Sequence, residues 1–324
     1  MDIFSKIRSE VRRIQLFFQT LKIHYRDFKY FYQNNNQYNC TDKSVMESQM
    51  LLYCHQLEKG LTHKNDSRIF GGEKAVRLAH FIESYLEKYE PNEITKLSIN
   101  VIYEYLQSPN AVKDEKQRNS ISIVVEKNKE VVRKGWSGIK ELNVPPAFDE
   151  SLINQFYQTR GSVRDFSGEP LSVEELEKVY KFVSWTPSAC NRQSCRIHYY
   201  CDREKMNSII DNQLGDQGWC HNATALFVIT ANTKYFNSHY ERYQALIDGG
   251  MFAMNFVMGL HLQHIASCFK MYVRGFKRDK AFRAITGIPQ EEIPVVVIMA
   301  GHYKEDVHIS TKSVRFVQDI KVNA

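Results

Sequence analysis

The chain has 324 residues, a length that favours two domains of ordinary size. Its apolar fraction of 43% and charged fraction of 25% are typical of a globular protein. A formal net charge of +6, without a defined motif, does not indicate a nucleic-acid partner. The seven cysteines are odd in number and lack C-x-x-C spacing, so we expect reduced thiols and a cytoplasmic protein. The charged N-terminus predicts no secretory signal, and we expect no membrane-spanning segment.

Residues 1–145 are predicted to form a helical domain. Apolar residues recur every 3.5 residues from Phe4 to Tyr32, which predicts a long helix with a coiled-coil seam. Through residue 30, seven basic residues accompany three acidic ones. The seam therefore fits packing on this protein or its twin, and it also fits peripheral contact with an anionic membrane. We expect a polar loop at 33–39, followed by a helix that ends at a C-cap Gly60. Three further helices are expected over residues 73–89, 94–106 and 112–133.

Helical periodicity stops over residues 136–146, which contain Gly138 and two prolines, so this segment is predicted to be a linker. The second domain, residues 146–324, is predicted to begin with a helix over 148–160. Next come Arg160, Ser162 and Arg164 at alternate positions. In an extended segment these side chains point the same way and form an anion or phosphate site. A solvated basic turn is the alternative interpretation of these residues.

A capping box, Ser172 with Glu175, predicts a helix that runs to about Trp185, where Pro187 stops it. The loop at 186–193 is rich in hydrogen-bonding groups and precedes a predicted strand at 196–200. Polar loops between regular elements commonly bind ligands. This loop is therefore a candidate binding element.

The ordered motifs of the second half resemble those of the nitroreductase family of FMN enzymes. The matching features are R-x-S-x-R-x-F at 160–166, P-S-x-x-N-x-Q at 187–193, an apolar strand at 225–230, a glycine-bearing helix at 245–265 and a buried strand at 294–300. The resemblance covers residues 148–317. It implies an α+β fold with a mixed, antiparallel-rich sheet flanked by helices. It also implies an intertwined homodimer with two FMN sites at the interface.

The resemblance further implies an FMN-dependent oxidoreductase that uses NADH or NADPH. Ping-pong hydride transfer through flavin to a small-molecule electron acceptor is the expected mechanism. The cofactor-binding residues that it implies are Arg160, Gly161, Ser162, Arg164, Ser188, Asn191, Gln193, Lys312 and Arg315. Among them, Arg164 is the expected catalytic residue, as a cation beside the flavin edge that gains negative charge on reduction.

A metal site is not predicted. Three possible ligands, His261, His264 and Cys268, have spacing that would place them on one helix face. A fourth ligand is not evident from the sequence, and the segment matches the helix that the resemblance assigns to the dimer interface.

Several segments depart from the family pattern. Ser194-Cys195 replaces a common Pro-Trp, residues 264–275 are atypical, and the region 232–244 is short. The substrate pocket is therefore not defined by the resemblance. Residues 55–61 resemble a segment found ahead of nitroreductase domains in proteins associated with exopolysaccharide gene clusters. The alternative function is a flavin-bearing or degenerate scaffold whose helical domain binds a membrane surface or a partner protein.

Overall fold

The computed structural model describes residues 3–35, 41–62, 68–135, 144–213, 221–273 and 275–309. The N-terminal part contains α1 (Ile3–Asn34), α2 (Lys43–Leu61), α3 (Gly72–Leu86), α4 (Glu93–Gln107), α5 (Glu115–Lys127) and the 3-10 turn η1 (Lys129–Val131). The later helices are α6 (Glu150–Thr159), α7 (Val173–Val183), α8 (Arg203–Asn212), α9 (Gln244–Leu262) and α10 (Phe276–Thr286). The strands are β1 (Cys195–Tyr200), β2 (Ala225–Asn232), β3 (Ile265–Met271) and β4 (Glu292–His302). Three 3-10 turns, η2 (Ala189–Asn191), η3 (Thr233–Tyr235) and η4 (His239–Glu241), connect them.

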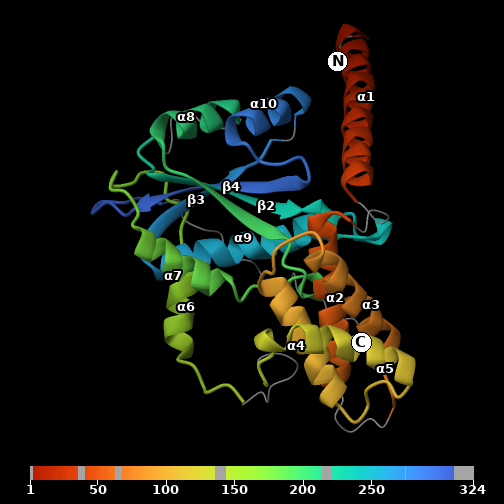
Figure 1. The fold of residues 1–324 in the computed structure, drawn as a ribbon. Coiled ribbons are helices and arrows are strands. Elements are labelled where there is room, and N and C mark those ends of the chain that lie inside the picture. The colour runs from red at the N-terminus through yellow and green to blue at the C-terminus, as the bar shows by residue number, and fades with distance from the viewer. Residues whose placement is uncertain are drawn as a thin grey trace, which may run out of the picture.

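The four strands form one sheet in the order β1-β2-β4-β3, with helices on both faces (Figure 1). The expected α+β class is confirmed, although every described strand pair is antiparallel rather than mixed. Side chains alternate along β2: Leu226 and Val228 face the α8–α10 layer, whereas Phe227 and Ile229 face the α7–α9 layer. The buried sheet therefore has a separate core on each face.

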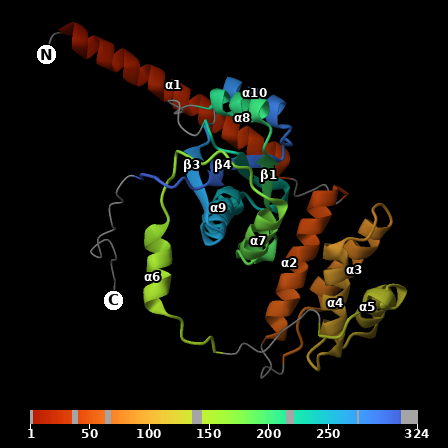
Figure 2. The same cartoon turned by 90° about the vertical axis from the view of Figure 1, so that its left-hand side faces the viewer.

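Helices α2 to α5 form a compact helical domain beside the sheet (Figure 2). Their shared core contains Met46, Leu57, Ile82, Ile102 and Val124. Asp42, Asn92 and Asp114 cap α2, α4 and α5 by accepting backbone N–H groups. The cap at Asp114 explains why the helix predicted from residue 112 begins later.

The prediction that Gly60 is a C-cap is wrong. Helix α2 continues through Leu61, and the C-cap is Thr62, which has right-handed φ and ψ angles. A Cβ atom at Gly60 would lie 2.3 Å from the Phe70 ring. Close packing against that ring, rather than a left-handed conformation, therefore requires glycine at this position.

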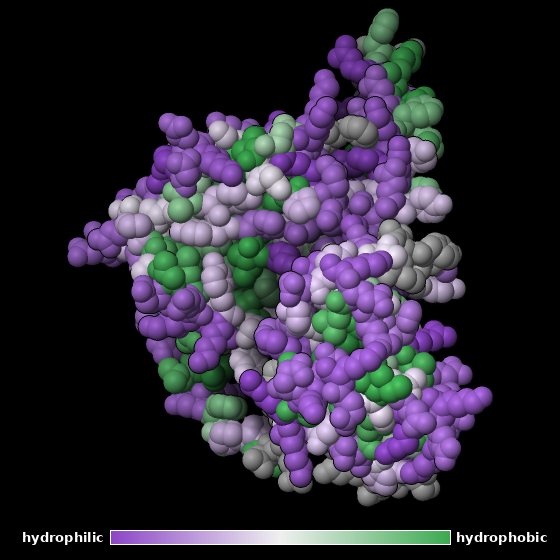
Figure 3. All heavy atoms as spheres, in the orientation of Figure 1, coloured by the Kyte–Doolittle hydropathy of each residue, from purple (hydrophilic) through white to green (hydrophobic). Residues whose placement is uncertain are grey.

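The predicted long helix at residues 4–32 is present as α1, but most of its seam does not pack on this chain. Phe4 is 78% exposed and Phe28 is 62% exposed. Figures 1 and 2 show the N-terminal part of α1 projecting from the molecule, and Figure 3 shows hydrophobic side chains along it. Near its other end, Tyr30 lies against Arg283, whose guanidinium carbon is 5.8 Å from the ring centroid. The seam is thus available to another molecule.

The helical domain packs directly on the loops around β1 and β2. The Ser48 hydroxyl of α2 donates to the Tyr235 carbonyl at 2.8 Å, and Lys234 lies 2.8 Å from the Asp42 carboxylate. Leu51 shares a buried cluster with Phe236. The two parts of the chain are therefore joined by polar and apolar contacts.

The segment His239–Leu262 is long and apolar enough to span a membrane by length and composition alone. Half of its most apolar window is buried inside the structure, as in the core helix of a globular domain.

Candidate active site

The segment with alternating arginines runs along the outer edge of β3. The Val163 N–H donates to the Ser267 carbonyl at 3.0 Å, which keeps the segment extended. Val163 and Phe166 are buried, while Arg160, Ser162 and Arg164 are half-buried. The three polar side chains thus alternate with inward-facing positions, as an anion site requires.

Arg160 has an unsatisfied polar atom. Its Nη1 atom is buried and has no hydrogen-bond partner among the residues that the structure describes. A buried donor on a charged group costs free energy unless it finds an acceptor. The Arg160 guanidinium also lies close enough to Tyr303 to oppose the rise that burial causes in the pKa of that tyrosine. An anionic oxygen ligand would satisfy the free nitrogen.

The carboxylate of Asp165, which follows Arg164 in the sequence, is paired with other residues. The Asp165 carboxylate pairs with Lys304 at 2.7 Å and accepts from the Asn222 amide. Hydrogen bonds from Lys304 and Asn222 lower the pKa of Asp165. Arg164 donates from Nη1 to the Ser162 carbonyl at 3.3 Å. The acid next to Arg164 in sequence is therefore engaged by different partners.

His261 of α9 contacts the end of α6. Its Nε2 atom is 3.0 Å from the Thr159 hydroxyl, its Nδ1 atom is 3.4 Å from the Tyr303 hydroxyl, and its ring stacks on Phe156. These contacts use both ring nitrogens to position the chain that leads into Arg160.

The shared helix face assumed for His261, His264 and Cys268 is not present. Helix α9 ends at Leu262, His264 adopts a left-handed φ of 56°, and Cys268 is buried in β3. The described residues contain no group of three or more side chains that could hold a metal ion.

The loop before β1 has an unusual backbone conformation. Cys190, Asn191 and Gln193 all have positive φ angles, between 51° and 53°. Such conformations in non-glycine residues cost about 1–3 kcal/mol each and cluster at functional sites. The Ser188 hydroxyl accepts from the Gln193 N–H at 2.9 Å, which closes the loop and leaves the Asn191 and Gln193 side chains exposed.

Two charged residues that the sequence analysis did not identify support this loop. Asp248 of α9 is buried and accepts from the Ala189 N–H at 3.1 Å. Arg192 is also buried; its Nε atom donates to the Ala189 carbonyl at 3.2 Å, and its guanidinium pairs with Glu241. Burial opposes the shift, but hydrogen bonds and charge from Arg192 lower the pKa of Glu241. In the sequence, the position of Asp248 within the otherwise largely apolar segment of α9 was the feature that could have identified it.

The atypical residues Ser194 and Cys195 join the loop to the sheet. Ser194 is buried and its carbonyl accepts from the Asn232 N–H at 2.9 Å. Cys195 begins β1, and burial raises the pKa of its thiol to about 12. This thiol is therefore protonated and unreactive near neutral pH.

Within one chain the two candidate groups lie at opposite edges of the sheet. Arg160, Ser162 and Arg164 border β3, whereas Ser188, Asn191 and Gln193 precede β1. Three strand spacings of about 4.8 Å separate these edges by roughly 14 Å. Lys312 and Arg315 lie outside the described residues. The structure therefore presents two half-sites.

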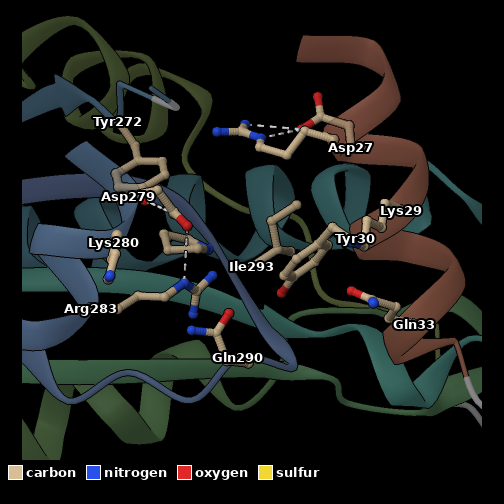
Figure 4. Close-up of a pocket in the computed structure, with 12 residues that line it drawn as sticks. Asp27, Lys29, Tyr30, Gln33, Tyr272, Asp279, Lys280, Arg283, Gln290 and Ile293 are labelled. Carbon is tan, nitrogen blue, oxygen red and sulfur yellow. Dashed lines mark hydrogen bonds and ion pairs between the residues drawn. The ribbon is translucent and has the colours of Figure 1, made fainter. Parts of the chain in front are cut away.

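A cavity of about 300 Å³ lies elsewhere, between α1 and α10. Figure 4 shows Tyr30 of α1 reaching toward Arg283 of α10 across it. Its charges are largely paired, because Arg26 contacts Asp27 at 3.0 Å and Arg283 contacts Asp279 at 3.3 Å. Among the residues that the structure describes, none of those predicted to bind the cofactor lines this cavity.

An antiparallel sheet between two helical layers, with an arginine-bearing edge and a strained polar loop, defines an α+β domain suited to binding an anionic ligand. Residues 157–216 match the model of the nitroreductase family. A protein of Archaeoglobus fulgidus, described as an NADH dehydrogenase/NAD(P)H nitroreductase, is 26% identical over 170 residues, which are 52% of this chain and 95% of that protein. This part of the chain is therefore similar to the nitroreductase family.

Two solved nitroreductase structures are similar to this chain. An FMN-dependent nitroreductase from Clostridium difficile superimposes with a TM-score of 0.46 and 19% identity, covering 53% of this chain and 99% of that one. A nitroreductase with bound FMN from Bacteroides fragilis gives a TM-score of 0.44 and 15% identity, covering 55% of this chain and 100% of that one.

Proposed function

We propose that the protein is an FMN-dependent NAD(P)H oxidoreductase of the nitroreductase type. The family match and the described activity of the Archaeoglobus protein support this reaction class. The structural observation that carries the proposal is the buried Nη1 atom of Arg160, near Ser162 in the sequence, which has no hydrogen-bond partner in the described part of the chain. A phosphate with up to two negative charges supplies the acceptor oxygens that this guanidinium lacks.

The residues present fit the cofactor. Arg160 and Ser162, with Lys312 and Arg315, would hold its phosphate. Gly161 lies between Arg160 and Ser162 in the proposed binding segment, and its lack of a side chain allows close packing, since a Cβ there would lie 2.4 Å from the Ile309 side chain. When bound, FMN supplies the capacity to accept and donate a hydride.

The remaining predicted residues would position the ring. We assign the flavin contacts to Ser188, Asn191 and Gln193. The loop leaves the Asn191 and Gln193 side chains exposed, and its backbone is held by the hydrogen bond from the Ala189 N–H to Asp248. Arg164 would provide a fixed positive charge that stabilises the charge added on reduction. This division assigns binding and electrostatic roles to side chains and requires no side-chain nucleophile.

A homodimer completes the proposed site. The half-sites lie at opposite edges of one sheet, so a second copy is needed to bring them together. Helix α9 offers a surface for that copy: Ile247 is 52% exposed, Met254 is 43% exposed, and a Cβ at Gly250 would meet no atom within 4 Å. In this arrangement residues 146–324 form the catalytic domain and residues 1–145 an added helical domain.

The visible absorption spectrum of purified protein tests the function. We expect a flavin band and NAD(P)H oxidation in the wild type, and release of FMN from Arg160→Ala. Arg12→Ala, which removes an exposed arginine of α1, is the control and should retain FMN. Full flavin occupancy in Arg160→Ala would remove Arg160 from the site.

A second candidate function follows from the exposed seam of α1. The helix combines exposed aromatic side chains with an excess of basic residues, which favours peripheral contact with an anionic membrane. Colourless wild-type protein that sediments with anionic vesicles would favour a membrane-binding scaffold over the enzyme. A role near exopolysaccharide synthesis rests on residues 55–61 and would be tested by polysaccharide production in a deletion strain.

A further inference from the structure

A line of hydrogen bonds connects the helical domain to the backbone of the candidate flavin loop. The Glu47 Oε2 atom of α2 accepts from the Tyr235 hydroxyl at 3.3 Å. The Arg196 Nη2 atom donates to the same hydroxyl at 3.0 Å. The Nη1 atom of Arg196 donates to the Gln193 carbonyl at 2.8 Å. Three side chains thus span from one domain to the loop residue whose φ is 53°.

The donor inventory fixes the direction of this relay, which we define as Glu47, Tyr235 and Arg196. A guanidinium can only donate, and an ionised carboxylate can only accept. The single proton of the Tyr235 hydroxyl must therefore point to Glu47, which leaves its oxygen to accept from Arg196. Hydrogen bonds ordered in one direction strengthen one another in a protein interior.

Further contacts hold the residues of the relay in place. The Glu47 Oε1 atom accepts from the Tyr85 hydroxyl at 2.9 Å and from the Asn92 amide at 2.8 Å, both within the helical domain. Tyr235 is buried, and the Arg196 guanidinium carbon lies 5.4 Å from its ring centroid. Burial raises the pKa of Tyr235 to about 12, so its hydroxyl stays protonated near neutral pH. The relay has few alternative geometries.

We propose that Glu47, Tyr235 and Arg196 are positioning residues that hold the Ser188–Gln193 loop in its left-handed conformation. Through them the helical domain preorganises the flavin site, although none of the three is assigned to touch the cofactor. This inference rests on the proposed function only where it concerns FMN affinity. The conformational effect on the loop is independent of that function.

Tyr235→Phe tests the proposal because it removes the central hydroxyl and preserves the ring. Amide hydrogen exchange in flavin-free protein should become roughly tenfold faster over residues 188–193, since part of the support for the loop is lost. The FMN dissociation constant should rise by about tenfold. Tyr105→Phe is the matched control: that buried hydroxyl bonds to Phe70 and Val112 inside the helical domain. It should lower thermal stability and leave both loop readouts unchanged.

Glu47→Gln is the second variant, and it remains informative if Tyr235→Phe fails to fold. It removes the charge of the terminal acceptor and should shift both readouts in the same direction by a smaller factor. Wild-type exchange rates over residues 188–193 in a folded Tyr235→Phe or Glu47→Gln protein would overturn the proposal. If wild-type protein binds no FMN, the proposed function fails, whereas the exchange comparison still decides the inference.

Discussion

The Asp248 carboxylate lies 3.1 Å from the backbone nitrogen of Ala189 and accepts its hydrogen bond. Its other oxygen accepts from the Gln244 amide at 2.8 Å within the first turns of α9. One buried acid therefore ties the candidate flavin loop to the helix that offers the proposed dimer surface. The position of the loop is therefore tied to the position of α9.

Asp248→Ala should destabilise the protein, because it leaves the Ala189 N–H without its acceptor. Losing the acceptor of this half-buried donor should cost about 1 kcal/mol in the free energy of unfolding. Asp248→Asn keeps an acceptor oxygen and should lose less. Urea denaturation followed by circular dichroism measures both, and equal stability of Asp248→Ala and wild type would contradict the assigned contact.

Arg164→Met should retain FMN and lower its reduction potential. Loss of the fixed cation removes stabilisation of the charge added on reduction, and about 30 mV corresponds to 1.4 kcal/mol for a two-electron couple. Reduction by NAD(P)H should slow accordingly, whereas Arg164→Lys, which keeps the charge, should lie closer to wild type. Spectroelectrochemical titration gives the potential. An unchanged value in flavin-loaded Arg164→Met would eliminate the electrostatic role.

Lowering the pH should destabilise the fold, because Glu241 becomes protonated. Burial raises its pKa, but the Arg192 contacts prevail, so the folded-state pKa lies below the ordinary value of 4.5. Its contribution is therefore fully present above the unfolded-state pKa and is lost as the pH falls through the folded-state value. Glu241→Gln should be less stable at neutral pH and should show a shallower loss below about pH 4.5. Parallel acid profiles for the two proteins would count against this assignment.

Sequence patterns predicted those elements that are determined by residues close together in the chain. The capping box at Ser172 forms as expected, because its partner Glu175 is one helical turn away. The strand Ile265–Met271 was not predicted, since a short apolar run after a long helix does not distinguish a strand from a helix end. Tertiary packing decides that case.

Long-range contacts of the site were beyond the reach of sequence patterns. Glu47 and Tyr235 are 188 residues apart, and nothing near either residue signals the other. The alternating arginines were evident because a period of two is visible in sequence, whereas the support from Asp248 depends on how α9 meets the loop. The proposed binding residues were therefore accessible from sequence, and the residues that position them were not.

Removing residues 1–25 should abolish association with anionic membranes. This truncation takes away most of the exposed α1 seam, leaves Phe28 and Tyr32, and retains Tyr30, which packs near Arg283. Full-length protein should sediment with anionic vesicles and not with neutral ones, while the truncated protein should stay in solution and keep its FMN. Sedimentation that ignores lipid charge, or that survives the truncation, would show that α1 is not an electrostatic anchor.

Met254→Glu should separate the subunits and release the cofactor together. Met254 lies on the exposed apolar face of α9, and a carboxylate there would be buried without a partner in the proposed interface, at a cost of several kcal/mol. Because each proposed site combines the Arg160 half-site of one copy with the Asn191 half-site of the other, monomers should bind FMN weakly. Ile123→Glu, at a half-exposed position of α5 outside that interface, is the matched control and should remain dimeric and yellow. Light scattering and flavin absorbance measured on the same fractions link the two effects. A Met254→Glu monomer that still holds FMN tightly would place the whole site within one chain and overturn the shared-site arrangement.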